Sequence, residues 1–348
     1  MTEARYWHDA GNGRAACDLC PHACEMGEGQ TGRCGVRQRR DGVLEAAGYG
    51  RLSSMQPDPI EKKPLYHFHP GATIFSIGGW GCNFSCDFCQ NWSISQRADL
   101  SAEPVAPEDV VQAARRAGSS SVAFTYNEPL VGIEYALDCS QAARAAGLAT
   151  VLVTNGYLRP EPGRDILALT DALNIDIKSM NEEFYRRYCK ASLAPVLAFA
   201  RQAAQTGCHV EITCLLIPGL NDAPADVDRL ANWISDNLGR HTPLHLSAYF
   251  PRYRMNVPPT DAQALETAAR LCEQRLDYVY LGNVASHVGR DTLCAKCGAV
   301  LIARHGYAID TVGLLDGVCA ACGQIPPIVL PAASATENNG KAANNERP

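Results

Sequence analysis

Seven short apolar runs alternate with helix-like segments between residues 65 and 290, and this alternation leaves few folds open to the chain. The apolar runs are rich in β-branched residues, and the segments between them repeat apolar residues at helical spacing. Strands are predicted at 72–78, 121–126, 149–154, 172–177, 209–217, 244–249 and 278–281, and helices near 107–117, 130–146, 195–206, 223–238 and 261–275. Such repetition predicts an α/β fold of parallel βα units with right-handed crossovers.

Three cysteines follow the first predicted strand. Cys82, Cys86 and Cys89 have the spacing C-x3-C-x2-C on a loop at the carboxyl end of that strand, where (β/α) barrels keep their catalytic groups. Three thiolates can hold three irons of a [4Fe–4S] cluster and leave the fourth iron open to chelate S-adenosylmethionine. Three buried thiols or a zinc knuckle are the alternatives, but the next cysteine is Cys139, too distant in sequence to complete a knuckle.

This spacing, with glycine and aromatic residues around it, resembles the motif of the radical S-adenosylmethionine superfamily. The resemblance implies a partial, TIM-like (β/α)6 barrel that carries a [4Fe–4S] cluster. It also implies an enzyme that reductively cleaves S-adenosylmethionine to a 5′-deoxyadenosyl radical, which abstracts hydrogen from a substrate. A metal-stapled scaffold or binding protein without turnover is the alternative function.

Polar residues follow the next three predicted strands and are candidates for holding S-adenosylmethionine. These candidates are Glu128, Thr154, Asn155, Asp176 and Lys178. A carboxylate at a strand end can pair with the ammonium of the methionyl group, and period-2 geometry points Asp176 and Lys178 to one face. The structural alternatives are a solvated glutamate, an ordinary Asn-Gly turn and an internal salt link.

The Thr-Asn-Gly and Asp-x-Lys stretches extend the resemblance to the activating-enzyme branch, typified by pyruvate formate-lyase activating enzyme. There the Asp-x-Lys pair contacts the ribose and carboxylate of the cofactor. Three features differ in this chain. Val153 stands where the branch generally has an acid, and Tyr126 with Asn127 replaces the two glycines of a Gly-Gly-Glu-Pro-like turn. The branch also has a ribose-binding histidine after the sixth strand, and this chain has none there. Either Arg252 or Tyr253 takes its place, or the contact is absent.

A closer resemblance is to the radical S-adenosylmethionine member of the AmmeMemoRadiSam system. The stretches that carry it are 17–34, 58–68, 79–92 and 281–283, with the C-terminal cysteine pairs, so it covers about residues 15–330. It implies association with AMMECR-like and Memo-like proteins and an electron donor such as flavodoxin or ferredoxin. A protein or RNA substrate fits the activating-enzyme branch, and a small metabolite stays open.

Eight further cysteines form two peripheral groups. The first, Cys17, Cys20, Cys24 and Cys34, has His22 as a spare ligand and can hold zinc or a second [4Fe–4S] cluster. The second, Cys294, Cys297, Cys319 and Cys322, forms two C-x2-C-Gly turns and predicts a zinc-ribbon-like site, with rubredoxin-like iron as the alternative. The remaining five are predicted to be small core residues: Cys139, Cys189, Cys208, Cys214 and Cys272.

Composition divides the chain into a Cys-rich metal module and arm at 1–64, the barrel at 65–290, a zinc-ribbon-like module at 291–331 and a disordered tail at 332–348. Residues 61–70 of this linking region either face the substrate or pack over the barrel. The net charge of −6 disfavours a protein-wide nucleic-acid footprint, and Arg37, Arg39 and Arg40 are predicted to form a solvated face. No signal core and no apolar run of roughly 20 residues is found, so a cytoplasmic protein without a membrane span is expected.

Overall fold

The computed structural model describes residues 2–331, and the tail predicted to be disordered, 332–348, lies outside this range. Within residues 2–331, none of the helices combines the length and apolarity that a membrane crossing requires.

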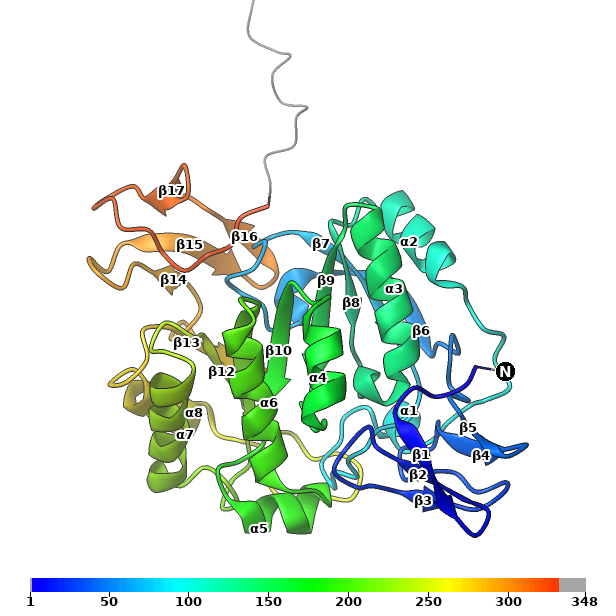
Figure 1. Cartoon of the computed structure of the whole chain (residues 1–348). Helices are drawn as coiled ribbons and strands as arrows, with labels where there is room; N and C mark the ends of the chain where they lie inside the picture. The colour runs from blue at the N-terminus through cyan, green and yellow to red at the C-terminus, as the bar shows by residue number, and fades with distance from the viewer. Residues whose placement is uncertain (1, 332–348) are drawn as a thin grey trace, which may run out of the picture.

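Eight strands form one sheet at the centre of the molecule (Figure 1). The strands β7 to β13 run parallel and in chain order, and β6 pairs antiparallel with β7 at one edge. Their bounds are β6 Ser54–Pro59, β7 Thr73–Gly78, β8 Ser121–Phe124, β9 Ala149–Thr154, β10 Ala172–Asp176, β11 His209–Leu216, β12 Leu244–Ala248 and β13 Val279–Gly282. The predicted α/β fold with parallel strands is therefore confirmed.

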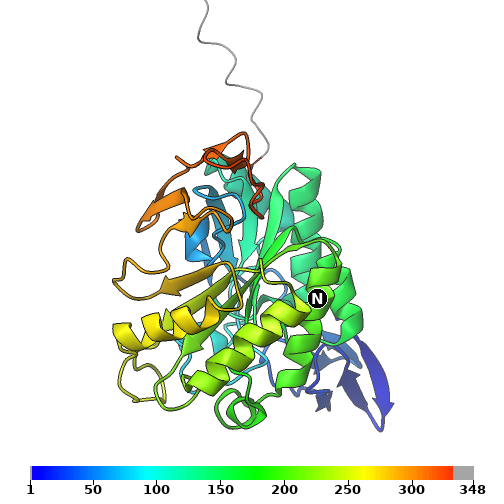
Figure 2. The same cartoon turned by 90° about the vertical axis from the view of Figure 1, so that its left-hand side faces the viewer.

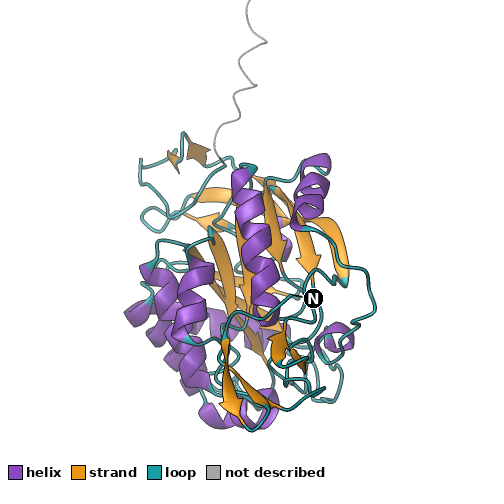
Figure 3. Cartoon of the chain, turned by 45° about the vertical axis from the view of Figure 1, so that its right-hand side comes forward, coloured by secondary structure: helices purple, strands orange, loops and turns teal. Residues whose placement is uncertain are grey.

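Helices cover one face of this sheet (Figure 3). They are α2 Pro107–Arg116, α3 Ile133–Ala145, α4 Pro160–Leu167, α6 Leu193–Gln205, α7 Pro224–Asn237 and α8 Ala262–Cys272. The strands alternate accordingly. In β11, Val210, Ile212 and Cys214 belong to the hydrophobic core, whereas Thr213 and Leu215 line a cavity on the opposite face. One face of the sheet thus carries the core, and the other is left for chemistry.

Two elements of the barrel are not predicted from the sequence. Strand β6 contains Pro57 and Pro59, which disfavour a strand, but it lies at the sheet edge, where a missing N–H donor is tolerated. Helix α4 begins Pro160-Glu-Pro162-Gly163, which is typical of a loop, although proline at the first helical position removes only an N–H that has no partner within the helix. Shorter elements are α1 Trp92–Ser95, α5 Glu182–Phe184 and a π-helical turn at Tyr185–Cys189.

The N-terminal module contains two small antiparallel sheets, one of β1 Trp7–Gly11, β2 Arg14–Cys17 and β3 Glu25–Met26, and one of β4 Gln38–Arg40 and β5 Val43–Glu45. A buried ion pair joins it to α3, because both guanidinium Nη atoms of Arg37 donate to the Glu134 carboxylate at 3.0 Å. The prediction of a solvated face is wrong for Arg37, which is 1% exposed, and for Arg39, which is also buried. A guanidinium can be buried here because the carboxylate supplies a bidentate partner.

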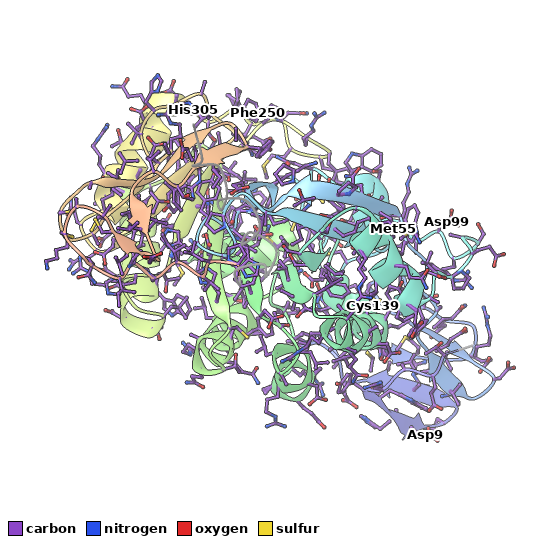
Figure 4. All side chains as sticks on the ribbon, turned by 90° about the horizontal axis from the view of Figure 1, so that it is seen from above. Asp9, Met55, Asp99, Cys139, Phe250 and His305 are labelled. Carbon is purple, nitrogen blue, oxygen red and sulfur yellow. The ribbon has the colours of Figure 1, made fainter. Side chains whose placement is uncertain are left out.

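The C-terminal module contains β14 Thr292–Leu293, β15 Val300–His305, β16 Ala308–Asp310, β17 Leu314–Leu315 and β18 Val318–Cys319. It lies on the barrel through main-chain hydrogen bonds, in which Val329 N donates to His67 O and His69 N donates to Val329 O, both at 2.7 Å. The two modules occupy opposite sides of the molecule (Figure 2), as the labelled Asp9 and His305 show from above (Figure 4). The domain limits at 64 and 290 stay a prediction; β6, before the first limit, belongs to the central sheet.

Candidate active site

A cavity of about 540 Å³ lies on the face of the sheet opposite to the helices. All eight residues predicted for the cluster and its cofactor line this one cavity: Cys82, Cys86, Cys89, Glu128, Thr154, Asn155, Asp176 and Lys178. They come from the loops or strand ends that follow β7, β8, β9 and β10. Parallel strands place their carboxyl ends at the same edge of a sheet, so residues from four distant segments meet there.

The cysteine loop after β7 is held rigidly by the main chain on both sides. Gly81 has φ +80°, and a Cβ at this position would lie 2.1 Å from the carbonyl oxygen of Cys34, so only glycine fits. On the other side, Ser85 N donates to Cys189 O at 3.0 Å. The Cys189 thiol lies beside Cys86, and its hydrogen bond lowers the pKa of the Cys86 thiol. Cys189 is buried, as predicted for a core residue, yet it also borders the site.

The donor set of this loop fits an iron–sulfur cluster better than a single metal ion. Within the described residues, the only group of three or more possible ligand atoms that all lie within 4.8 Å of one another is the C-terminal set. Cys82, Cys86 and Cys89 therefore surround the cavity without converging on one point. In a four-iron cluster each cysteine binds a separate iron, so wider spacing of the thiols is required.

Glu128 holds the turn that follows β9. Its carboxylate accepts hydrogen bonds from Leu130 N at 3.1 Å, from the Thr154 hydroxyl at 2.7 Å and from Asn155 N at 2.8 Å. Burial raises the pKa of Glu128 to about 7, although the hydrogen bonds from Asn155, Thr154 and Leu130 act in the opposite direction. The amide of Asn155 in turn donates to Asn83 Oδ1 at 2.8 Å and lies 3.8 Å from Cys82 Sγ. Glu128 thus connects the turn to the cysteine loop.

Asp176 and Lys178 form an ion pair inside the cavity, with Lys178 Nζ 2.9 Å from Asp176 Oδ2. Ile177 between them is fully buried in the core, as the period-2 pattern predicts. Burial acts to lower the pKa of Lys178, but the Asp176 carboxylate and the Cys86 thiol outweigh it, so the pKa is raised. Asp176 and Lys178 therefore form an internal salt bridge and also line the cavity. A polar ligand in the cavity can bind to both side chains.

A second polar group borders the cavity, and its Asp58 and Tyr126 are not predicted from the sequence. Asp58 in β6 accepts hydrogen bonds from Lys62 Nζ at 2.8 Å, from Lys63 Nζ at 2.7 Å and from the Tyr126 hydroxyl. Burial acts to raise the pKa of Asp58, but these donors outweigh it and hold the pKa below its usual range. Lys62, Lys63 and Tyr126 line the cavity, as does Tyr307 from the C-terminal module.

Residues 61–70 lie partly at the cavity and partly over the barrel. Lys62 and Lys63 face the cavity. The following main chain packs over the barrel instead, where Tyr66 N and His67 N donate to the buried Glu211 carboxylate at 2.9 and 2.7 Å. In contrast, Arg252 and Tyr253, considered as substitutes for a ribose-binding histidine, are not among the residues that line the cavity. Tyr253 stacks on Trp92 next to the cysteine loop.

The C-terminal cysteines have the geometry of a single four-coordinate ion. Two Sγ–Sγ distances, Cys294 to Cys322 and Cys297 to Cys319, are both 3.7 Å. A tetrahedral ion with metal–sulfur bonds of about 2.3 Å requires roughly 3.8 Å. Each knuckle closes on a glycine in the left-handed region, Gly298 or Gly323, as the C-x2-C-Gly pattern predicts. A four-cysteine cluster able to bind metal in this module is therefore confirmed.

Comparison with known proteins agrees with this geometry. The model of the family described as Radical SAM superfamily matches residues 77–234. The chain is 41% identical over 336 residues to "Uncharacterized protein MJ0808" of Methanocaldococcus jannaschii, a match that covers 95% of this chain and 100% of that protein. It is 28% identical over 162 residues to pyruvate formate-lyase 1-activating enzyme of Escherichia coli, covering 45% of this chain and 66% of that enzyme.

Among solved structures, a radical SAM methyltransferase from Sphaerobacter thermophilus matches with a TM-score of 0.48 and 16% identity, over 62% of this chain and 68% of that one. Residues 77–234 thus form a domain of the radical SAM superfamily, which uses an iron–sulfur cluster and S-adenosylmethionine, and the chain is an enzyme of this type. The chain is similar along nearly its whole length to MJ0808, and over 162 residues to the activating enzyme.

Proposed function

We propose that this enzyme binds a [4Fe–4S] cluster through Cys82, Cys86 and Cys89 and uses it to cleave S-adenosylmethionine reductively. One observation carries the proposal: these three thiols and five polar residues chosen from sequence alone line the same cavity. When bound, the cluster supplies the electron that converts S-adenosylmethionine to methionine and a 5′-deoxyadenosyl radical, which abstracts hydrogen from the substrate.

The remaining residues of the site bind and orient S-adenosylmethionine. Thr154 and Asn155 present a hydroxyl and an amide from the turn after β9, and Glu128 fixes that turn through three hydrogen bonds. Asp176 and Lys178 present an acid and an ammonium group toward the ribose and the carboxylate. Phe88, buried against Phe184 at a ring distance of 5.9 Å, adds an apolar wall.

The substrate side of the cavity is the part lined by Lys62, Lys63, Tyr126 and Tyr307. A protein or RNA substrate suits this open, polar wall. The activating enzymes to which part of the chain is similar carry pyruvate formate-lyase in their names, which supports a macromolecular substrate. We place the chain in the AmmeMemoRadiSam system, where AMMECR-like and Memo-like proteins are its partners and a flavodoxin or ferredoxin is its electron donor.

We assign zinc to the C-terminal four-cysteine site, because the 3.7 Å Sγ–Sγ distances suit one tetrahedral ion and zinc commonly fills such sites. The cytoplasm is the expected compartment, since the cysteines of the described residues are all unpaired thiols.

The proposal is tested by 5′-deoxyadenosine formation. The chain is reconstituted anaerobically with iron and sulfide, reduced with dithionite and given S-adenosylmethionine. Wild type and Cys139→Ala, a buried cysteine of α3 outside the cavity, form 5′-deoxyadenosine, whereas Cys86→Ala does not. Absence of the product from wild-type chain with an intact cluster contradicts the proposal and favours a scaffold without turnover.

The substrate is identified by isotope transfer. Deuterated candidate proteins, RNAs or metabolites are supplied, and deuterium appears in 5′-deoxyadenosine only with the true substrate. The AMMECR-like and Memo-like proteins are supplied first, alone and together. If both leave the rate of 5′-deoxyadenosine formation and its deuterium content unchanged, the assignment to that system is wrong while the radical chemistry stands.

A further inference from the structure

The four N-terminal cysteines line one enclosed pocket beneath the cysteine loop of the active site. Cys17, Cys20, Cys24 and Cys34 form its wall with His22, Arg37 and Asn83. The main chain brings the cysteines together, since Cys17 N donates to Cys24 O at 2.9 Å and Ala23 takes a left-handed φ of +46° between two of them. Four thiols that face one pocket indicate a metal site rather than a set of core residues.

Their spacing differs from that of the C-terminal site. The C-terminal thiols meet at 3.7 Å, as a single tetrahedral ion requires. Within residues 2–331, no three possible ligand atoms of the N-terminal group all lie within 4.8 Å of one another. The N-terminal thiols thus line one pocket without converging on a single point, as Cys82, Cys86 and Cys89 do.

Arg37 gives an independent indication of what the pocket holds. Its side chain is almost fully buried and lines the pocket, and its Nε–H has no hydrogen-bond partner. The two Nη atoms are engaged by Glu134, so Nε is the donor left over. A buried donor without a partner is costly. The cysteinyl or inorganic sulfur atoms of an anionic cluster provide the acceptor that is otherwise missing.

One ring nitrogen of His22 is engaged by the main chain. Its Nε2–H donates to Asn83 O at 2.7 Å, and its ring packs against Tyr157 with a centroid distance of 5.1 Å. The four cysteines are by themselves a complete ligand set for a four-iron cluster, one for each iron. Full coordination leaves no open iron, so this site cannot chelate a second S-adenosylmethionine.

We propose that Cys17, Cys20, Cys24 and Cys34 hold a second [4Fe–4S] cluster, not a zinc ion. Asn83 lines the N-terminal pocket and is the residue after Cys82, and Gly81 lies against Cys34. The two cysteine groups are therefore direct neighbours through the residues on either side of Cys82. This position suits a one-electron carrier: a flavodoxin- or ferredoxin-class donor loses one electron, the N-terminal cluster gains it, and it then passes to the active site. The carrier role rests on the function proposed above, whereas the metal content does not.

The test removes the active-site ligands and counts what remains. The full chain carrying Cys82→Ala, Cys86→Ala and Cys89→Ala is purified and reconstituted anaerobically. We expect about four iron and four acid-labile sulfide per chain, and dithionite produces the electron paramagnetic resonance signal of a reduced four-iron cluster. Sulfide decides the result, because neither zinc nor a rubredoxin-like iron site contains it. About two zinc ions and no sulfide per chain overturn the proposal.

Two further variants in the same background assign the metal to its site. The double variant Cys20→Ala and Cys34→Ala removes the iron and sulfide and leaves the C-terminal metal, whereas Cys297→Ser removes the C-terminal metal and leaves iron and sulfide. The wild-type chain serves as a control for folding, because it carries no substitution. It contains about eight iron atoms if both clusters are present and about four if only the active-site cluster is present. A wild type that forms 5′-deoxyadenosine with only four iron and two zinc refutes the second cluster and leaves the proposed function intact.

Discussion

Replacing Glu128 by glutamine should weaken S-adenosylmethionine binding while leaving the cluster in place. The carboxylate receives two backbone N–H groups, from Leu130 and Asn155, one on each oxygen, and the Thr154 hydroxyl. Glutamine has the same shape but presents an NH2 group in place of one oxygen. In either orientation that NH2 faces a backbone N–H, so one hydrogen bond is lost and a buried donor is left without an acceptor.

The size of the effect follows from that single loss. A buried donor without a partner costs about 1–3 kcal/mol. Because the turn at Thr154 and Asn155 must return to its native position to contact S-adenosylmethionine, binding carries this cost. At about 1.4 kcal/mol per factor of ten, the dissociation constant should rise about 5- to 150-fold.

Anaerobic calorimetric titration of the reconstituted protein with S-adenosylmethionine measures this change. Iron and sulfide are counted in the same samples. Glu182→Gln is the matched control: its exposed carboxylate also accepts a backbone N–H, from Leu193 at 2.9 Å, but lies outside the cavity. Binding by Glu128→Gln within twofold of wild type, with the cluster complete, would refute the positioning role of Glu128.

Three further predictions concern stability and metal content. In the cofactor-free chain, the free energy of unfolding falls as the pH rises from about 4.5 to about 7, because native Glu128 keeps a proton that the unfolded chain releases; urea titrations at several pH values show this for wild type and not for Glu128→Gln. Glu134→Gln leaves the Arg37 charge buried without a full partner and lowers the free energy of unfolding by about 3–5 kcal/mol, whereas Glu183→Gln, at an exposed ion pair, changes it by less than about 1 kcal/mol. Equal effects of the two would contradict the buried pair. Cys297→Ser loses about one zinc per chain by metal analysis without loss of 5′-deoxyadenosine formation, and loss of iron instead would show that the C-terminal site holds iron.

Local patterns in the sequence were sufficient for the elements that build the barrel. Apolar runs and helical spacing act over a few residues, and every strand from β7 to β13 lies where they predict. Exceptions occur where a local signal competes with position in the fold. The prolines of β6 disfavour a strand unless it lies at the edge of a sheet. Whether β6 lies at an edge depends on how all the strands of the sheet are ordered.

The candidate site divides in the same way. Cys82, Cys86 and Cys89 lie close in sequence, and the polar residues at strand ends follow from chain order, because parallel strands end at one edge. The role of Asp58 could not be found from its neighbours, since its partner Tyr126 is 68 residues away and reaches it only after β6 is added to the sheet. Arg37 likewise resembles a surface charge until α3 supplies Glu134.

The amino-acid sequence by itself determined which functional groups are present and where they lie along the chain. It shows which cysteines are clustered and which strand ends carry acids, amides and an ammonium group. What only the tertiary structure decided is how far apart those thiols are held. The N-terminal and C-terminal groups each contain four cysteines, but two Sγ–Sγ distances of the C-terminal group are 3.7 Å, whereas no three thiols of the N-terminal group all lie within 4.8 Å of one another. Sulfur-to-sulfur distance depends on how separate turns are packed against the barrel, and it is this distance that distinguishes a place for one ion from a place for four irons.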